Sequence, residues 1–317
     1  MNFQPWRIGF SYVPDNCLSW HHLLFTAHFG HSMITYSPQA KNNVSNMLNR
    51  VLAIMLLTVC SVSTVQAAGT DTVFASFEGY KPVYVLNSWF MDREGSEHGY
   101  QDQELAIQIS LKKQIVSSFY FGYSHKAFWQ IYDLGNSRPF REQNYNPEIF
   151  LDYGQQWGFE HLRFGLEHES NGERMRFDEN GEPVNYSRTW DRAYLFLQKQ
   201  ATSFLSISLK AWVVTSPETE EYRAYYDDNP DMQQYLGSGE VGLRLDVSGV
   251  LANLMLRRGW RDGTETFRMD IQVPIRLFLE KTNSANAIHL QAFSGYGDSL
   301  IDYDRKVTRM AVGISFH

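Results

Sequence analysis

Cysteine is scarce in this sequence of 317 residues: the only two, Cys17 and Cys60, both precede residue 68. Residues 68–317 therefore cannot form a disulfide or hold a metal ion through thiolates. An excess of positive charge is also missing, because the formal net charge is −7. That balance gives no reason to expect nucleic acid as a partner.

Long apolar runs are absent as well. After Ala68 no stretch approaches the roughly 20 apolar residues that a membrane-spanning helix needs. Aromatic residues are plentiful instead, at 15% of the chain. Carbohydrate-binding proteins and proteins with aromatic belts at a membrane interface both favour such an excess, and the count alone does not choose between them.

A stretch near the start has the layout of a secretory signal peptide. Arg50 is followed by an apolar core that ends at Cys60 and then by small residues suited to cleavage. A membrane anchor helix is the alternative, but the apolar run is too short for one. We predict a signal peptide over 47–67 within a leader of residues 1–67, and a mature domain over residues 68–317.

The mature domain repeats a hydrophobic pattern of period two, which indicates β-strands. The clearest run alternates from Phe267 to Leu279, and the last from Met310 to Phe316, while the opposite positions carry Arg, Asp, Gln and Lys. About twelve such strands follow one another from Tyr80 onward. They run to about ten residues or more, longer than the usual five or six of soluble sheets.

Two all-β architectures fit this alternation. A soluble sandwich buries one face of each sheet in a common core, whereas a transmembrane barrel turns its apolar face to lipid and its polar face to the lumen. Strand length, the signal peptide and the apolar C-terminal strand favour the barrel. We predict an all-β fold, a transmembrane antiparallel β-barrel of about twelve strands in a bacterial outer membrane.

Loop lengths orient the predicted barrel. The turn at 246–249 is short, while the connections at 170–188 and 216–231 are long and polar. Because outer-membrane barrels have short periplasmic turns and long outer loops, we expect the long connections to face the cell exterior. Four tryptophans fall near predicted strand ends, where interface girdles sit: Trp129, Trp157, Trp190 and Trp260.

Two polar residues interrupt the apolar face of one predicted strand. Apolar residues alternate from Leu162 to Leu166, and His168 and Ser170 take the next two positions of that face. Residues two apart lie about 6.6 Å apart on one face, so the imidazole can reach the hydroxyl. Asp191 has the apolar parity of the next strand, and the hairpin places it alongside His168.

This arrangement predicts a Ser-His-Asp site on the barrel exterior at headgroup depth. Ser170 would be the nucleophile, His168 the general base, and Asp191 the group that fixes the tautomer of the imidazole. The alternative is that polar residues merely decorate the strand ends. Three suitable residues with matched parity on adjacent strands are less expected by chance, but parity alone leaves both interpretations open.

Several longer motifs carry a family resemblance. They are HESNG at 168–172, SRTWDRAY at 187–194, SRPFREQNYNPEIFL at 137–151, DDNPD at 227–231 and SGYGDSLIDY at 294–303. Together they resemble the outer membrane phospholipase A family. The resemblance implies a twelve-stranded barrel that hydrolyses acyl esters of phospholipids and lysophospholipids, depends on Ca²⁺ and is active as a homodimer.

The resemblance also implies roles for single residues. It agrees with Ser170 as nucleophile and His168 as base, and it assigns the Gly172 amide to the oxyanion hole. The family has an asparagine where this chain has Asp191. The calcium ligands that it implies are the Ser187 hydroxyl, the Glu173 carbonyl, a carbonyl of Ser137 from the partner subunit, and a calcium-linked carboxylate at Asp228.

Two other functions remain open from the sequence. A lipid A deacylase would also be a barrel hydrolase with an exterior site, but it would act on a saccharolipid. A passive outer-membrane barrel would need no function from Ser170 at all.

Overall fold

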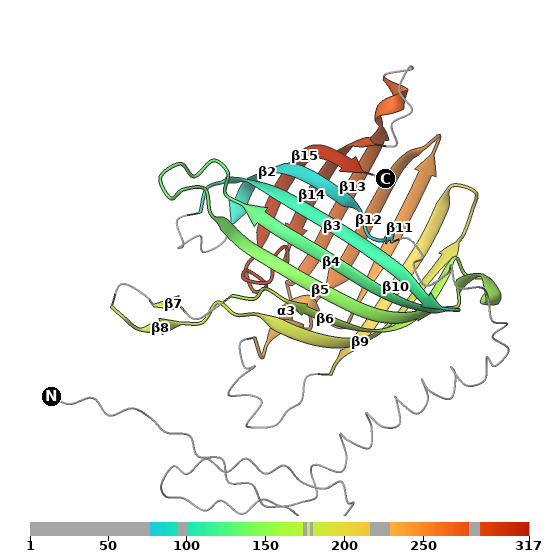
Figure 1. The fold of residues 1–317 in the computed structure, drawn as a ribbon, viewed down its shortest axis with the longest axis horizontal. Helices are drawn as coiled ribbons and strands as arrows, with labels where there is room; N and C mark the ends of the chain where they lie inside the picture. Colours follow the sequence, from blue (N-terminus) through green and yellow to red (C-terminus); the bar gives the residue numbers. More distant parts are fainter. Residues whose placement is uncertain are drawn as a thin grey trace, which may run out of the picture. The chain divides into compact units, whose positions relative to one another are not determined.

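A computed structural model of the chain describes the residues 77–93, 100–173, 176–177, 180–215, 229–278 and 286–316. The predicted leader, residues 1–67, lies outside this part. The described residues are almost entirely β-structure (Figure 1). No helix among them is both long and apolar enough to span a bilayer.

Twelve strands form one closed antiparallel sheet (Figure 1). Strands that follow one another along the chain pair with each other, and the pairing of the last strand with the first closes the ring. The prediction of about twelve strands in an antiparallel barrel is therefore confirmed. The strands are β2 (Val83–Arg93), β3 (Gln103–Val116), β4 (Phe119–Trp129), β5 (Phe140–Asp152), β6 (His161–Ser170), β9 (Thr189–Gln200), β10 (Leu205–Val214), β11 (Gly239–Val247), β12 (Val250–Arg258), β13 (Glu265–Pro274), β14 (Ala287–Gly295) and β15 (Val307–Phe316).

The remaining elements are short. The two-residue strand β1 (Glu78–Gly79) pairs with β3, and the strands β7 (Arg176–Phe177) and β8 (Pro183–Val184) pair with each other between β6 and β9. The helix α3 (Met232–Leu236) lies between β10 and β11. Two 3-10 turns, η1 (Gly154–Trp157) and η2 (Ile275–Leu277), follow β5 and β13.

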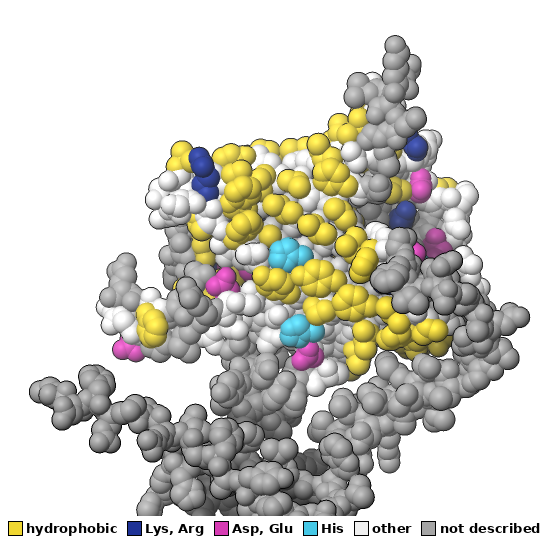
Figure 2. Space-filling model, in the orientation of Figure 1, with side chains coloured by type: hydrophobic (Ala, Val, Ile, Leu, Met, Phe, Trp, Pro, Cys, Tyr) yellow, Lys and Arg dark blue, Asp and Glu magenta, His cyan; other side chains and the backbone are white. Residues whose placement is uncertain are grey.

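The outer wall of the barrel is apolar and the lumen is polar. On β15, Met310 and Val312 point outward and are 52% and 38% exposed, while Arg309 and Ala311, which alternate with them, are buried inside. Hydrophobic side chains cover most of the wall formed by β2 to β5 in Figure 2. A soluble sandwich would have the opposite arrangement, so this distribution is the one expected of a transmembrane barrel.

One predicted strand is shorter than its sequence pattern. Hydrophobic alternation runs on to Leu279, but β13 ends at Pro274 and the 3-10 turn η2 follows. Proline has no N–H to donate to a neighbouring strand, so it commonly ends a strand. The alternation beyond Pro274 was therefore misread as strand.

Trp190 was also misplaced by the sequence interpretation. It is 3% exposed in the lumen, where its ring meets Trp212 edge-on at 6.1 Å and lies 3.8 Å from the guanidinium of Arg192. Trp157 and Trp260, in contrast, are 69% and 59% exposed near strand ends, as a girdle requires. Trp190 belongs to the inner packing of the barrel.

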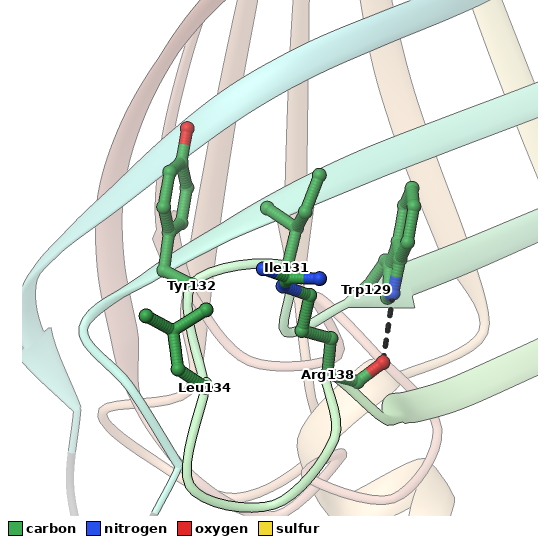
Figure 3. Close-up of a pocket in the computed structure, with 5 residues that line it drawn as sticks. All are labelled: Trp129, Ile131, Tyr132, Leu134 and Arg138. Atoms are coloured by element: carbon green, nitrogen blue, oxygen red, sulfur yellow. Dashed lines mark hydrogen bonds between the residues drawn. The ribbon is translucent and has the colours of Figure 1, made fainter.

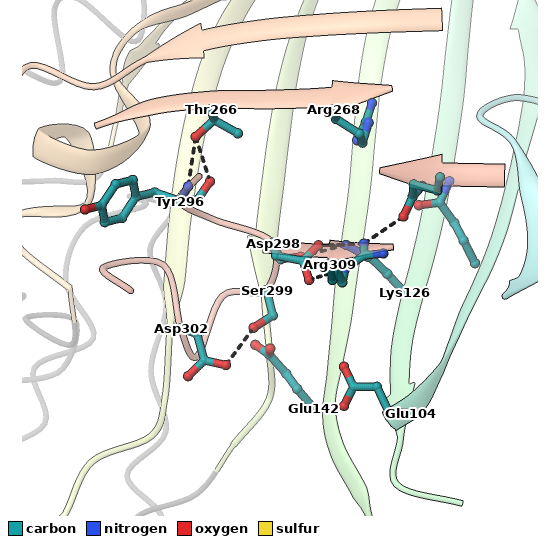
Figure 4. A network of polar contacts seen from close by, with 12 residues as sticks. Glu104, Lys126, Glu142, Thr266, Arg268, Tyr296, Asp298, Ser299, Asp302 and Arg309 are labelled. Atoms are coloured by element: carbon teal, nitrogen blue, oxygen red, sulfur yellow. Dashed lines mark hydrogen bonds and ion pairs between the residues drawn. The ribbon is translucent and has the colours of Figure 1, made fainter. Parts of the chain in front are cut away.

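The connection 296–306 between β14 and β15 folds into the lumen (Figure 4). Asp302 accepts a bond of 2.7 Å from Arg141 on β5, and Asp298 accepts one of 2.7 Å from Arg309. Burial alone would raise the pKa of Asp298, but Arg309 and Lys126 hold that pKa well below its usual range. These contacts place paired, buried side chains inside the barrel.

Candidate active site

The pairing of β6 with β9 brings two predicted site residues face to face. His168 lies directly opposite Asp191, and Ser170 lies opposite Thr189. Residues directly opposite in an antiparallel pair share a face of the sheet. The face is the outer wall, because Glu167 and Arg192, one position away, are buried in the lumen.

Hydrogen bonds join the three predicted residues in a chain. The Nδ1 atom of His168 lies 2.8 Å from Oδ1 of Asp191, and its Nε2 atom lies 3.0 Å from Oγ of Ser170. An ionised carboxylate can only accept a hydrogen bond, so Nδ1 carries a hydrogen and donates a hydrogen bond to Asp191. The lone pair of Nε2 is then free to accept the hydroxyl proton of Ser170. The serine is thereby set up for activation by a general base.

The site is open on the wall side. The side chains of His168 and Asp191 are 42% and 37% exposed. Tyr145 on β5 lies opposite Ser170. The ring of His125 on β4 packs against the Tyr145 ring, with the two centroids 5.0 Å apart. These two aromatic rings therefore lie beside Ser170 on the outer wall.

Ion pairs on the lumen side hold the strand that carries His168. Glu167 accepts from Lys210 at 2.7 Å and from Arg192 at 3.0 Å, and Arg192 also contacts Glu169 at 2.9 Å. The amide of Asn146 donates to the backbone oxygen of His168 at 2.8 Å. The outward imidazole thus stands on a backbone fixed by buried charge pairs.

Asn171 ties together the two ends of the loop that follows Ser170, and the sequence interpretation gave it no role. Its Oδ1 atom accepts from the amides of Glu173 at 3.2 Å and Arg188 at 2.9 Å, and its Nδ2 donates to the oxygen of Tyr186 at 2.8 Å. The residue is 3% exposed. Only its place between the serine and the glycine of HESNG could have pointed to it.

Gly172 occupies a backbone conformation that favours glycine. Its φ of +61° lies in the left-handed region, and a Cβ atom there would meet the Tyr145 ring at 3.3 Å. Any other residue would therefore strain the chain next to Ser170. The turn aims the backbone away from the β6 direction immediately after the serine and Asn171.

Two predicted calcium ligands, Glu173 and Ser187, belong to the two loop segments that Asn171 joins. The Asn171 carboxamide bonds the amide of Glu173 on one side and that of Arg188, next to Ser187, on the other. A carbonyl and a hydroxyl are hard oxygen donors of the kind that Ca²⁺ takes. Within the described ranges, no cluster of three or more His, Cys, Asp or Glu could hold a metal. The residues fit calcium only as a site built from carbonyl, hydroxyl and water oxygens.

Of the other two predicted ligands, only Ser137 is among the described residues, and it is not brought to this place. Ser137 lies in the connection between β4 and β5, exposed and with a φ of +60°. In the described part of the chain it makes no hydrogen bond to the residues around Ser170. Asp228 lies outside the described residues.

Comparisons with known proteins give one consistent family. Residues 62–316 match the model of the family described as Phospholipase A1. The phospholipase A1 of Klebsiella pneumoniae is 28% identical over 254 residues, which cover 74% of this chain and 80% of the relative. That of Escherichia coli K12 is 28% identical over 197 residues, which cover 61% of this chain and only 60% of the relative.

Two solved structures share the fold. One is the outer membrane phospholipase of Salmonella typhi, solved as a dimer with bound calcium, with a TM-score of 0.63 at 23% identity over 79% of this chain and 94% of that one. The other is outer membrane phospholipase A from Escherichia coli, with a TM-score of 0.63 at 24% identity over 77% of this chain and 99% of that one. At these identities the likeness shows the barrel alone.

Proposed function

Because this chain belongs to the phospholipase A1 family, we propose that it is a calcium-dependent phospholipase of the bacterial outer membrane. It hydrolyses acyl esters of phospholipids and lysophospholipids. The observation that carries the proposal is the hydrogen-bonded chain Asp191–His168–Ser170 on the apolar outer wall. A nucleophile in that position meets an acyl ester that lies in the leaflet beside the barrel.

The first half of the reaction transfers the acyl group to the enzyme. Oγ of Ser170 attacks the ester carbonyl carbon while its proton passes to Nε2 of His168. Asp191 holds Nδ1–H and stabilises the imidazolium that forms. When the tetrahedral intermediate collapses, the bond to the glycerol oxygen breaks and His168 returns its proton to that oxygen. The lysophospholipid leaves and the acyl group stays on Ser170.

The second half releases the fatty acid. A water molecule attacks the acyl carbon, and Nε2 of His168 takes its proton. The ester bond to Oγ then breaks, and the proton returns to Ser170. The same chain of hydrogen bonds therefore serves both halves, and the enzyme is restored unchanged.

Two groups would stabilise the oxyanion in each half. Gly172 comes two residues after the nucleophile. Its left-handed backbone conformation turns its N–H relative to the direction of β6. Calcium, when bound, would supply positive charge beside Ser170. Glu173 and Ser187 would hold the ion with the Glu173 carbonyl and the Ser187 hydroxyl, and Asp228 would support it.

A homodimer completes this site. Ser137, which lies exposed in the connection between β4 and β5, would add its carbonyl to the calcium of the second copy. Because one chain supplies few ligands, ordering the ion from both copies would couple calcium binding to association.

Labelling with an alkyl sulfonyl fluoride tests the assignment. We expect one label per chain, mapped by peptide mass to Ser170, in the calcium-loaded protein in micelles. The matched control is Ser294→Ala, because Ser294 also faces outward near the same end of a strand. A label on another residue would overturn the assignment, and no label together with no hydrolysis would favour a passive barrel. Release of fatty acid from purified lipid A, but not from phospholipid, would favour a lipid A deacylase.

A further inference from the structure

The lumen of the barrel contains a cavity that the Ser170 site does not use. Its volume is about 690 Å³. Its lining includes the residues from Gly79 to Val83, where β2 begins, and Phe316, where β15 ends. Both places lie at the end of the barrel opposite to Ser170, because β6 ends at that serine and neighbouring strands are antiparallel. The cavity therefore reaches the end of the barrel that lies away from the proposed active site.

Small side chains on two paired strands leave this space. Gly242 on β11 lies directly opposite Ser208 on β10, and both line the cavity. A Cβ atom on Gly242 would collide with the hydroxyl of Ser208. A larger side chain at either position would project into the cavity, so the hollow follows from two inward positions that carry little side-chain volume.

Two arginines line the cavity from β11 and β13. Arg244 lies opposite Asn253 on β12, and Arg268 lies opposite Met255 on the same strand. Met255 is 9% exposed and points inward, and Arg268 shares its face of the sheet. The Arg268 side chain is nevertheless 45% exposed. Its exposed surface therefore belongs to the cavity and not to the outer wall.

These two guanidinium groups are incompletely neutralised. Within the described ranges the Arg244 side chain makes no hydrogen bond or ion pair. Arg268 lies 3.2 Å from a carboxylate oxygen of Asp270. That carboxylate also meets Nε2 of His289 at 2.9 Å and accepts a bond of 2.6 Å from Gln291. One carboxylate shared among three partners is the only anionic group in contact with either arginine among the described residues.

The other charged groups of the lining have opposite charges beside them. The ammonium groups of Lys81 and Lys210 pair with carboxylates of other strands at 2.9 and 2.7 Å. Glu240, the remaining carboxylate of the lining, lies directly opposite Lys210 on β10 and Arg257 on β12. The excess positive charge of the lining is therefore located at Arg244 and Arg268.

One buried donor of the lining also lacks an acceptor. Gln272 is 3% exposed, and its Nε2 atom has no hydrogen-bond partner in the described part of the chain. It follows Arg268 and Asp270 at intervals of two along β13, so the three side chains share the inward face. A buried donor without an acceptor is destabilising, and an oxyanion bound in the cavity would supply the missing acceptor.

A second, smaller hollow has a different character. It has a volume of about 370 Å³, lies in the connection between β4 and β5 (Figure 3), and four of its five lining side chains are apolar. That connection carries Ser137, which the proposed function assigns to the contact between two copies. The luminal cavity differs in both respects, because its lining is charged and it lies inside a single copy.

We propose that the luminal cavity binds the phosphate group of a small, water-soluble molecule. Arg244 and Arg268 pair with its oxygens, and Nε2 of Gln272 donates to one of them. Guanidinium groups suit a phosphate because their parallel N–H donors match its oxygens, and two of them suit its double negative charge. The occupant enters from the aqueous side at the end opposite to Ser170, so it is not a substrate of the outer wall.

Titration calorimetry of the protein in micelles of an uncharged detergent, without calcium, tests the proposal. Inorganic phosphate and glycerol phosphate are the two probes, because they carry the same group without and with an organic part. We expect a dissociation constant of about 1 mM or lower for at least one of them. Tighter binding of glycerol phosphate would identify a phosphate ester as the occupant, and tighter binding of inorganic phosphate would identify the free ion. Neither probe contains an acyl ester, so the result is independent of the role of Ser170.

Arg244→Gln should weaken binding by at least about tenfold, because it removes a charge-assisted pair, and Arg244→Lys should keep part of the affinity. Gln272→Leu should weaken binding by about threefold, through the loss of one neutral donor. Arg276→Gln is the matched control and should bind as tightly as the unchanged protein. Arg276 is exposed in η2 at the same end of the barrel but does not line the cavity.

Three results would overturn the proposal. One is the absence of binding of either probe at concentrations up to about 10 mM. Another is equal weakening in Arg244→Gln and Arg276→Gln, which would mean an effect of overall surface charge. The third is unchanged binding in both Arg244→Gln and Arg268→Gln, which would place the anion elsewhere on the protein. Circular dichroism of each variant in the same micelles checks that the barrel is folded.

Discussion

Two histidine–aspartate pairs in this barrel have similar hydrogen bonds and very different surroundings. His168 and Asp191 lie on the outer wall with Nδ1 and Oδ1 2.8 Å apart, and their side chains are 42% and 37% exposed. His289 and Asp270 lie in the lumen with Nε2 and Oδ1 2.9 Å apart, and their side chains are 0% and 10% exposed.

The difference between the pairs lies in the second ring nitrogen. In the wall pair that nitrogen meets the hydroxyl of Ser170 at 3.0 Å. In the lumen pair the Nδ1 atom of His289 is buried without a hydrogen-bond partner among the described residues, and the Tyr84 ring stands edge-on at 5.3 Å. A histidine–aspartate bond therefore does not by itself mark a catalytic pair. A hydroxyl on the other ring nitrogen and exposure on the outer wall separate the two pairs, and the proposed function rests on these two features.

The largest expected effect is the loss of His168. We expect His168→Ala to lower phospholipid hydrolysis by at least about 10⁴-fold, because Ser170 then has no base to accept its proton. The unfolding free energy should change by no more than about 0.5 kcal/mol, since the side chain is partly exposed and in no buried network. Turnover in micelles and denaturant unfolding in the same lipid provide the two readouts. Near-normal turnover would remove the distinction between the two pairs.

Removal of calcium should be the next largest effect, and it should concern the wall pair alone. We expect excess chelator to lower hydrolysis by about 10²–10³-fold, the cost of losing one stabiliser of the oxyanion. The barrel should stay folded in chelator, because the described ion pairs of the lumen are formed among protein side chains. Full activity of a monomer in chelator would contradict both the calcium requirement and the dimer.

Asp191 offers a smaller and more discriminating test. We expect Asp191→Asn to keep activity within about a hundredfold, roughly 2.7 kcal/mol, because a correctly oriented amide oxygen can still accept from Nδ1 of His168. Asp191→Ala should lose more, since nothing then orients the ring. Steady-state kinetics of the three forms decide between roles: a loss near 10⁴-fold in the Asn variant would mean that the carboxylate is required. An unchanged Ala variant would exclude Asp191 from the site.

Asn171 should affect the site indirectly. We expect Asn171→Ala to raise the calcium concentration needed for half-maximal activity by about tenfold, because the loop segments at Glu173 and Ser187 lose their common partner, at about 1.4 kcal/mol. Saturating calcium should restore most of the turnover. A purely structural role would instead lower turnover at every calcium concentration, which a calcium titration distinguishes.

The positions of His168, Ser170 and Asp191 on the outer wall were predictable because strand geometry fixes them locally. Alternation places His168 and Ser170 on one face, and the adjacent strand brings Asp191 into register with them. The same alternation would have placed Trp190 in the lumen, since it directly precedes Asp191. The expectation of a girdle at strand ends was wrong there because it ignored that parity.

The lumen was not predictable in the same way. Asp302 and Arg141 pair across 161 residues of sequence, so the 296–306 connection has its partner on a strand far away along the chain. Periodicity says which side chains point inward, but not which of them meet. Asn171 was missed for a related reason, because its bonds depend on how a long loop returns to β9. Hydrogen bonds of this kind depend on the tertiary path of the chain, which no local pattern specifies.

The smallest expected effect on activity completes the comparison and concerns His289. His289→Leu fills a similar volume but removes a hydrogen bond to the carboxylate of Asp270, which keeps its contacts with Gln291 at 2.6 Å and Arg268 at 3.2 Å. A bond to a charged group contributes about 1.5–3 kcal/mol when it is buried, so the unfolding free energy should fall by about that amount. Turnover should stay within about twofold, because His289 points into the lumen whereas Ser170 lies on the outer wall, and because His289 touches no reacting atom. The two variants should therefore give opposite results in the two assays. His168→Ala should lose activity at nearly constant stability, and His289→Leu should lose stability at nearly constant activity. A large loss of turnover in His289→Leu at unchanged stability would mean that the lumen pair takes part in the reaction.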